Sequence, residues 1–186
     1  LVQSGVAHVF LRNPLGSTII GYGNGPSAGN PDEEDGNFLL TQTGTYTMRV
    51  ESLTGNTPAY QVATYDVTTP DQSALTVGSP VSGVIERPGG TDEWLLNITS
   101  GQNLWFQALS VTGAIFVKST LYAPSGAVVF NKLSPDYGPA SFTETGTYRL
   151  VMDGLRDDTP SYSFIVRDTT PVVRTIQIGG TGESTI

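Results

Sequence analysis

Apolar and polar residues alternate along several short segments of the chain, which is typical of β-strands with one buried face. Residues 46–50 read Tyr-Thr-Met-Arg-Val, and residues 148–152 repeat the alternation as Tyr-Arg-Leu-Val-Met. Further strands are expected at residues 7–11, 60–62, 75–77, 81–86, 93–99, 104–109, 115–121, 127–130 and 162–166. With no helical period in the chain, the pattern predicts an all-β protein of jelly-roll-like β-sandwich domains.

The predicted strands belong to a sequence that repeats itself. Thr43-Gly44-Thr45-Tyr46 recurs as Thr145-Gly146-Thr147-Tyr148, an offset of 102 residues (145 minus 43). One residue is lost further on, and Pro70 matches Pro171 at an offset of 101. A period of about 100 residues is too long for a solenoid unit, so each copy is expected to be a small domain.

The copies differ in extent. Residues 70–171 form a complete unit, residues 1–69 lack the beginning of a unit, and residues 172–186 supply only a beginning, which matches residues 71–85. We therefore expect one complete and one incomplete sandwich in tandem, followed by a C-terminal strand extension. Because the sequence carries no initiator Met and no signal peptide, we expect it to be a processed or excised piece of a longer protein.

Composition narrows the range of partners. An apolar content of 38% with 22 Gly and 12 Pro suits a turn-rich β protein. A net charge of −8, with lysine at Lys118 and Lys132 only, argues against binding to nucleic acid or to an anionic membrane surface. No apolar run is long enough for membrane insertion. The absence of cysteine excludes disulfides and metal–thiolate sites within this sequence.

Motifs of the complete unit resemble a known family. They are Asp92-Glu93-Trp94-Leu95-Leu96-Asn97-Ile98, Gly101-Gln102, Leu121-Tyr122-Ala123-Pro124-Ser125-Gly126 and Thr145-Gly146-Thr147-Tyr148. In this order they resemble the bacterial pre-peptidase C-terminal domain. The first unit keeps Leu11–Gly16 and its own Gly-Thr-Tyr, but lacks the Asp-aromatic strand. The resemblance implies a secreted, non-catalytic sandwich attached to extracellular enzymes or adhesins, and some members bind calcium or collagen.

Residues suited to catalysis are scarce. His8 is the only histidine, so a Ser-His-Asp arrangement would have to use it, yet it lies on an alternating run where an outward polar position is expected. Neither Lys118 nor Lys132 has a pattern that supports a Ser-Lys pair. The sequence thus predicts a protein that is not an enzyme.

The acidic loop at residues 32–37 is the main candidate for a metal site. Asp32, Glu33 and Asp35 supply carboxylate oxygens, which calcium prefers, although the loop lacks the spaced ligand order of known calcium loops. The alternative is a solvated loop. Asp92 and Glu93 form a second candidate. Tyr22, Tyr65 and Tyr137 could contact a ligand, although tyrosines in sandwich loops commonly only pack.

The tail carries an opening strand beside a first unit that lacks one. We expect the tail of one subunit to complete the first unit of the next by strand donation, giving a head-to-tail polymer. The proposed donated residues are Thr175, Ile176, Gln177, Ile178 and Ile186. Nothing in the chain replaces residues 86–111 for the first unit, unless residues 1–6 form a shortened substitute. The alternative is a fragment of a longer array whose tail packs on its own second unit.

Two functions follow from these observations. The first is a non-catalytic structural or adhesive protein on the bacterial cell surface, assembled from identical subunits as a fibre. Its expected partners are other copies and an extracellular matrix or cell-surface ligand. The alternative is a C-terminal accessory module that aids secretion or substrate targeting of a secreted peptidase or other hydrolase.

Overall fold

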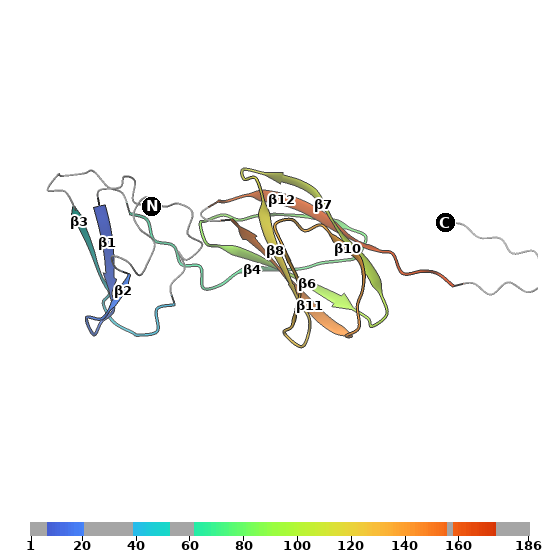
Figure 1. The fold of residues 1–186 in the computed structure, drawn as a ribbon, viewed down its shortest axis with the longest axis horizontal. Helices are drawn as coiled ribbons and strands as arrows, with labels where there is room; N and C mark the ends of the chain where they lie inside the picture. The colour runs from blue at the N-terminus through green and yellow to red at the C-terminus, as the bar shows by residue number, and fades with distance from the viewer. Residues whose placement is uncertain (1–6, 21–38, 53–61, 156–157, 174–186) are drawn as a thin grey trace, which may run out of the picture.

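The computed structural model describes residues 7–20, 39–52, 62–155 and 158–173, and it confirms the all-β prediction. Within those residues the strands form three sheets of three, four and five strands (Figure 1). In the described part of the chain, no helix is long and apolar enough to cross a membrane.

The first sheet contains β1 (Ala7–Arg12), β2 (Thr18–Ile20) and β3 (Thr47–Ser52). Its order is β2-β1-β3, and both pairings are antiparallel. A tight turn joins β1 to β2, because the Asn13 side chain accepts hydrogen bonds from the backbone N–H groups of Leu15 at 3.1 Å and Ser17 at 2.8 Å. Asparagine favours such turns by this kind of local hydrogen bond.

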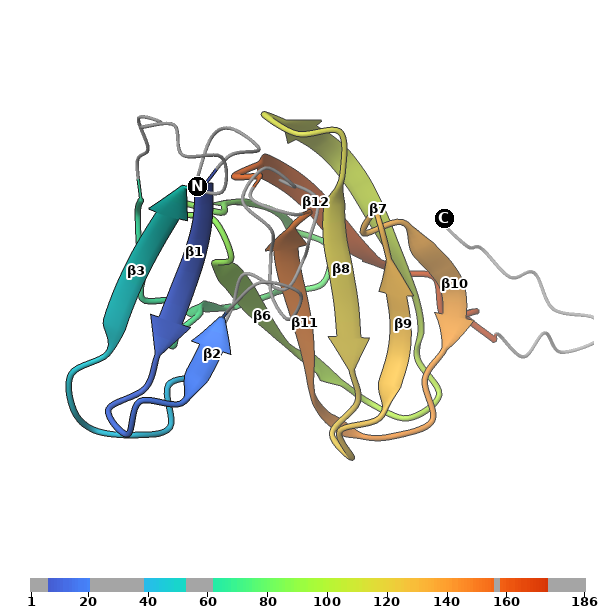
Figure 2. The ribbon, with the colours of Figure 1, turned by 60° about the vertical axis from the view of Figure 1, so that its left-hand side comes forward.

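Nine further strands build the second unit. They are β4 (Asp71–Ala74), β5 (Pro80–Val84), β6 (Thr91–Ile98), β7 (Asn103–Thr112), β8 (Val117–Tyr122), β9 (Val128–Lys132), β10 (Tyr137–Ser141), β11 (Gly146–Gly154) and β12 (Ser161–Asp168). One sheet has the order β10-β7-β12-β5 and the other the order β4-β6-β11-β8-β9. Without β4, the two sheets together have the strand order of an eight-stranded jelly roll, as predicted (Figure 2). β4 is added parallel to β6 at the edge.

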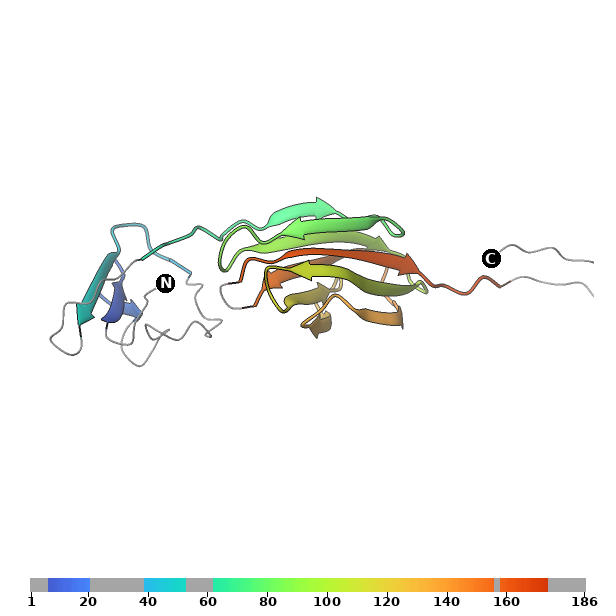
Figure 3. The same ribbon diagram turned by 90° about the horizontal axis from the view of Figure 1, so that it is seen from above.

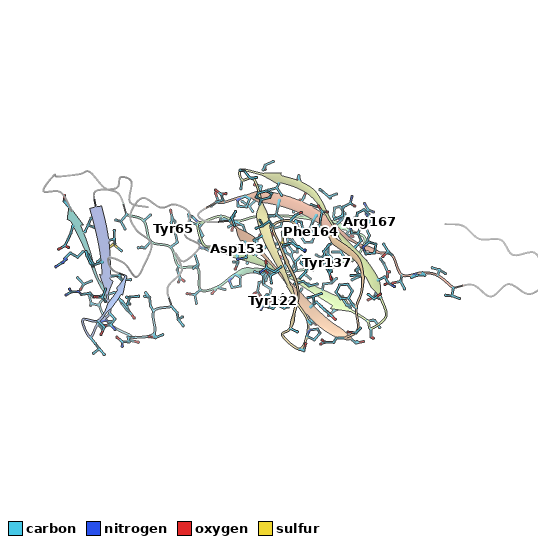
Figure 4. The ribbon with its side chains drawn as sticks, viewed as in Figure 1. Tyr65, Tyr122, Tyr137, Asp153, Phe164 and Arg167 are labelled. Atoms are coloured by element: carbon cyan, nitrogen blue, oxygen red, sulfur yellow. The ribbon has the colours of Figure 1, made fainter. Side chains whose placement is uncertain are left out.

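The core lies between these two sheets, where alternate residues of each strand meet. In β11, for example, Tyr148, Leu150 and Met152 are buried while the residues between them are half-buried. Phe164 points into the same space from β12 (Figure 4). The core is rich in aromatic contacts, such as the edge-to-face packing of Phe142 on Tyr148 with ring centroids 5.4 Å apart.

The first sheet reproduces the geometry of three strands of the second unit. Ala7 pairs with Ser52 and Arg12 with Thr47 between β1 and β3. The first unit matches the second at an offset of 110 residues for β1 (Leu11 against Leu121) and of 102 for β3, so these are the pairs of β8 and β11, in which Val117 faces Gly154 and Tyr122 faces Arg149. The order β2-β1-β3 thus matches β9-β8-β11 in the larger sheet.

Local contacts before β3 and β11 also match. The Tyr46 hydroxyl donates to the Gln42 carbonyl at 3.0 Å, and the Tyr148 hydroxyl donates to the Glu144 carbonyl at 3.1 Å. Gly146 has a φ of 152°, and a Cβ there would lie 2.8 Å from the Pro124 ring. Gly44 meets Pro14 in the same way, with a φ of 145°. Each Gly-Thr-Tyr motif therefore needs glycine for backbone conformation and space.

The structure differs from the strand predictions at several positions. The strand expected at residues 75–77 lies at Asp71–Ala74, because parallel pairing with β6 ends where Leu75 turns into the core. β2 and β10 were not predicted, and Gly138-Pro139 within β10 favours a turn. In the predicted strand 60–62, residues 60 and 61 lie outside the described residues, and Val62 is in no strand.

The chain enters and leaves the sandwich at opposite ends. Asp71 begins β4 beside Asp92, near the start of β6. The exit lies past the other end of β6, where the backbone N–H of Thr169 donates to the Asn103 carbonyl at 2.7 Å. Seen from above, the segment before β4 reaches one end of the sandwich, and the segment after β12 leaves from the other (Figure 3).

Candidate functional site

Three carboxylates from separate strands meet at the end of the sandwich where the chain enters. Asp71 begins β4, Glu86 follows β5, and Asp92 lies near the start of β6. One oxygen of each lies within 4.8 Å of the others. Calcium binds oxygens at about 2.3–2.6 Å, so ligands of one ion lie at most about 5 Å apart. The three groups are therefore close enough to bind one hard divalent cation.

Asp92 is the buried member of this carboxylate cluster. Its Oδ2 accepts a hydrogen bond from the Tyr162 hydroxyl at 2.5 Å, and that hydroxyl accepts one from Trp94 Nε1 at 2.8 Å. The chain of hydrogen bonds crosses the core from one sheet to the other. Gly83 on β5 leaves room for it, because a Cβ there would contact the Tyr162 hydroxyl and lie 2.6 Å from Asp92 Oδ2.

The surroundings of Asp92 and Tyr162 favour the protonated form of both side chains. Burial raises the pKa of Asp92, the hydrogen bond from Tyr162 partly opposes this, and the nearby Glu86 and Asp71 raise it further. Burial also raises the pKa of Tyr162, and its hydrogen bond to Asp92 adds to that effect. Tyr162 is therefore a firm hydrogen-bond donor at neutral pH, and a cation beside Asp92 would relieve the repulsion among the carboxylates.

The raised pKa of Asp92 predicts a pH dependence of stability. Its contribution is fully present below the pKa of the unfolded chain and is lost as the pH rises through the folded pKa. In chelator, the free energy of unfolding of the native protein should therefore fall with rising pH relative to that of Asp92→Asn. Urea titrations across the acidic range measure this difference.

Asp168 provides a control, because its contribution to stability should depend on pH in the opposite direction. Hydrogen bonds from the Thr170 hydroxyl and backbone, with a smaller one from Gln102, lower its pKa. Its contribution is present above the unfolded pKa and is lost as the pH falls through the folded pKa. Asp168→Asn should therefore remove stability at neutral pH and little in strong acid. If the free energies of unfolding of the native protein and of Asp92→Asn change with pH in parallel, the pH dependence does not come from Asp92.

The predicted pair of Asp92 and Glu93 is separated by the alternation of β6. Asp92 points inward, whereas Glu93 forms an ion pair with Arg149 and accepts a hydrogen bond from Gln72 Nε2 at 3.2 Å. Arg149 also lies over the Tyr122 ring, 4.5 Å from its centroid. Glu93 thus stabilises the outer face of the sheet, and the structure brings Asp71 and Glu86 to Asp92 in its place.

Other predicted site residues fall in different places. The acidic loop with Asp32, Glu33 and Asp35 lies outside the described residues, as do Tyr22 and the tail with Thr175, Ile176, Gln177, Ile178 and Ile186. Tyr137 stacks on Phe130 with centroids 4.4 Å apart, so it packs at the core. Tyr65 is exposed in the segment before β4 (Figure 4).

The first sheet offers a second candidate surface. Met48 of β3 is 39% exposed, whereas its counterpart Leu150 of β11 is fully buried. Tyr46 and Val50 are only half-buried where Tyr148 and Met152 are buried. Among the described side chains of β1, β2 and β3, none is buried. The apolar face of this strand is thus buried in the second unit, whereas in the described part of the first unit it is half-buried to exposed.

No protein-family model and no curated protein matches the sequence. Among solved structures, the chain is similar to the pre-peptidase C-terminal domain of a collagenase from Bacillus anthracis, with 17% identity and a TM-score of 0.44 over 55% of this chain and all of that one. It is also similar to PliG, a periplasmic inhibitor of g-type lysozyme. The Salmonella Typhimurium protein has 16% identity and a TM-score of 0.41 over 54% of this chain and all of that one. The Aeromonas hydrophila protein has 12% identity and a TM-score of 0.38 over 53% and 100%.

Proposed function

We propose that this is a non-catalytic, secreted structural protein whose subunits join head to tail by strand donation. In this arrangement, residues 174–186 of one subunit complete the first sheet of the next. The contrast between exposed Met48 and fully buried Leu150 carries the proposal. A strand that repeats a core strand in sequence and register, but has an uncovered apolar face, is suited to receive a partner.

The tail carries apolar residues at suitable positions. At the offset of 101, Ile176 and Ile186 match Leu75 and Ile85, which are 6% and 1% exposed in the sandwich core. Ile178 matches Val77, which packs against the same core. Burying one such side chain is worth about 1.5–3 kcal/mol, so three would oppose dissociation strongly.

The geometry of entry and exit favours donation between subunits. The eight residues of β6 span about 25 Å, and the tail leaves past the end opposite to the entry. Residues 174–186 extend at most about 45 Å. A tail returning along its own sandwich would use more than half of that length before it reached its own first sheet. A neighbouring subunit in line receives it without this detour.

The mass of the native assembly tests the proposal. Size-exclusion chromatography with light scattering and electron microscopy should detect polymers far heavier than the 19.7 kDa chain. Deleting residues 174–186 should abolish them and leave the melting transition of the sandwich in place. Monomers of the full chain alone would rule out strand donation and leave the accessory module as the better function. Polymers of the truncated chain would also rule it out.

Calcium is the proposed ligand of the carboxylate cluster, whose hard oxygen donors fit this ion. Asp71, Glu86 and Asp92 would hold it and so tie β4 and the segment after β5 to β6. Calcium at ten times its Kd stabilises a fold by about 1.4 kcal/mol, which for a domain of this size raises Tm by roughly 5–10 °C. Scanning calorimetry with calcium and with chelator measures this shift.

Paired variants locate the ion. The double variant Asp71→Asn, Glu86→Gln should lose the calcium response, whereas the triple variant Asp32→Asn, Glu33→Gln, Asp35→Asn should keep it. The reverse result would place calcium at the acidic loop. An unchanged Tm of the native protein in chelator would remove calcium from the proposal.

A further inference from the structure

Among the described strands, β3 pairs with β1 on one side, and its other side, called here the free edge of β3, occupies a defined position in the fold. β3 ends the sheet β2-β1-β3, whereas its counterpart β11 lies inside the sheet β4-β6-β11-β8-β9. Since β1 pairs with β3 in the register of β8 with β11, the free edge of β3 corresponds to the edge that β6 fills in the second unit. There, residues 146–153 of β11 pair antiparallel with residues 91–98 of β6.

The other described edge strands are short, irregular or interrupted by proline. They are β4 with four residues, β5 with Pro80, β9 with a register shift, β10 with Pro139 and a register shift, and β2 with three residues and a register shift. Such features block the addition of further strands. β3 has six residues, no proline and a continuous register with β1. Among the described edges, it is thus the one suited to a new strand.

Building on the proposed function, we infer that the donated tail binds the free edge of β3 antiparallel, in the position of β6. The tail matches residues 71–85, which contain β4 and β5, yet it cannot take the position of β4 in the first sheet. β4 pairs with β6 through Asp71 and Asp92, and no described strand of the first sheet stands in for β6. Of the two described edges of the first sheet, β3 has the longer strand with a continuous register, and it offers its backbone groups to such a strand.

The apolar residues set the register. Ile178 lies opposite Met48 and Ile176 opposite Val50, so that both isoleucines cover the exposed face of β3. A shift by two residues in one direction keeps the faces but places Arg174 opposite Val50, where its charge would lie on the apolar face. The same shift in the other direction places Gly180, which has no side chain, opposite Met48. In the register that we infer, Arg174 lies opposite Ser52, at the end of β3. Directly opposed residues are about 4.5–5.5 Å apart, which is within disulfide reach.

The absence of cysteine from the chain makes cross-linking a clean test. Chains with Arg49→Cys are mixed with chains with Gln177→Cys, because these outward positions are directly opposed in the inferred register. After polymer formation has been verified by electron microscopy, mild oxidation should give a disulfide-linked dimer whose linked peptides mass spectrometry identifies. Thr18→Cys on β2, the opposite edge of the same sheet, is the matched control and should not be linked to Gln177→Cys.

A second donor variant tests the register. Thr175→Cys would face Arg49→Cys only after the shift by two residues, so preferential linkage of that pair would overturn the register. Linkage at Thr18→Cys in its place, or polymers with no linkage to Arg49→Cys, would overturn the β3 edge while strand donation stood. If the native chain forms no polymer, the proposed function itself fails, and the two failures are thus distinguished.

Discussion

Leu150→Asp is expected to unfold the sandwich, whereas Met48→Asp is expected to leave its melting transition within about 2 °C of the native value. The two residues occupy the same position of the repeat, but Leu150 is fully buried and Met48 is 39% exposed. Truncating a buried leucine costs about 2–5 kcal/mol, and an unpaired charge in its place costs several more. Together these losses approach the whole stability of a domain of this size, about 5–15 kcal/mol.

Tryptophan fluorescence measures this contrast, because both tryptophans, Trp94 and Trp105, lie in the sandwich. Leu150→Asp should lose its cooperative thermal transition, and Met48→Asp should keep it. The milder pair Leu150→Ala and Met48→Ala gives a graded control, with a loss of about 2–5 kcal/mol expected only at Leu150. Because both tryptophans report on the sandwich, equal losses from Met48→Asp and Leu150→Asp would mean that the sandwich of the same chain already covers the face of β3, and the acceptor role would fail.

The sequence predicted the sandwich well where alternation and turn residues agree. In β11, buried Tyr148, Leu150 and Met152 follow the alternation, and the Gly-Thr-Tyr motif before them marks the strand start. Prediction failed where pairing outweighs local preference. β10 contains Gly138-Pro139 and exists because it pairs with β7 across a register shift. β4 begins at Asp71 because β6 lies beside it, which no local pattern indicates.

The candidate site was predictable only in part. The sequence singled out Asp92, but it joined this residue to its neighbour Glu93, although adjacent residues of a strand point to opposite faces. Asp71 and Glu86 reach Asp92 through the parallel pairing of β4 with β6 and the end of β5. That register depends on contacts between strands that are distant in the sequence, and no local pattern of residues indicates it. The repeat, by contrast, could be read directly, since Gly44 and Gly146 mark matching turns.

Two defective chains are expected to restore a single junction when they are mixed. Met48→Asp keeps its tail but has a charged acceptor face, so it can only donate. The chain truncated after residue 173 keeps β3 but has no tail, so it can only accept. Each alone should be a monomer, because a head-to-tail contact needs one donor and one acceptor. An equimolar mixture should give a complex of about twice the 19.7 kDa mass of one chain, and nothing larger.

Light scattering after size exclusion measures these masses, and two differently labelled truncated chains provide the control that should not associate. Dimers of either variant alone would indicate a symmetric contact between identical surfaces, which is incompatible with donation. Monomers in the mixture would contradict donation of the tail to β3. A complex of two chains that forms only in the mixture is the informative result. A symmetric contact would also give dimers of each variant alone, and unspecific aggregation would not stop at two chains. Such a complex would show that each subunit has one donor and one acceptor, and that growth of the fibre requires both.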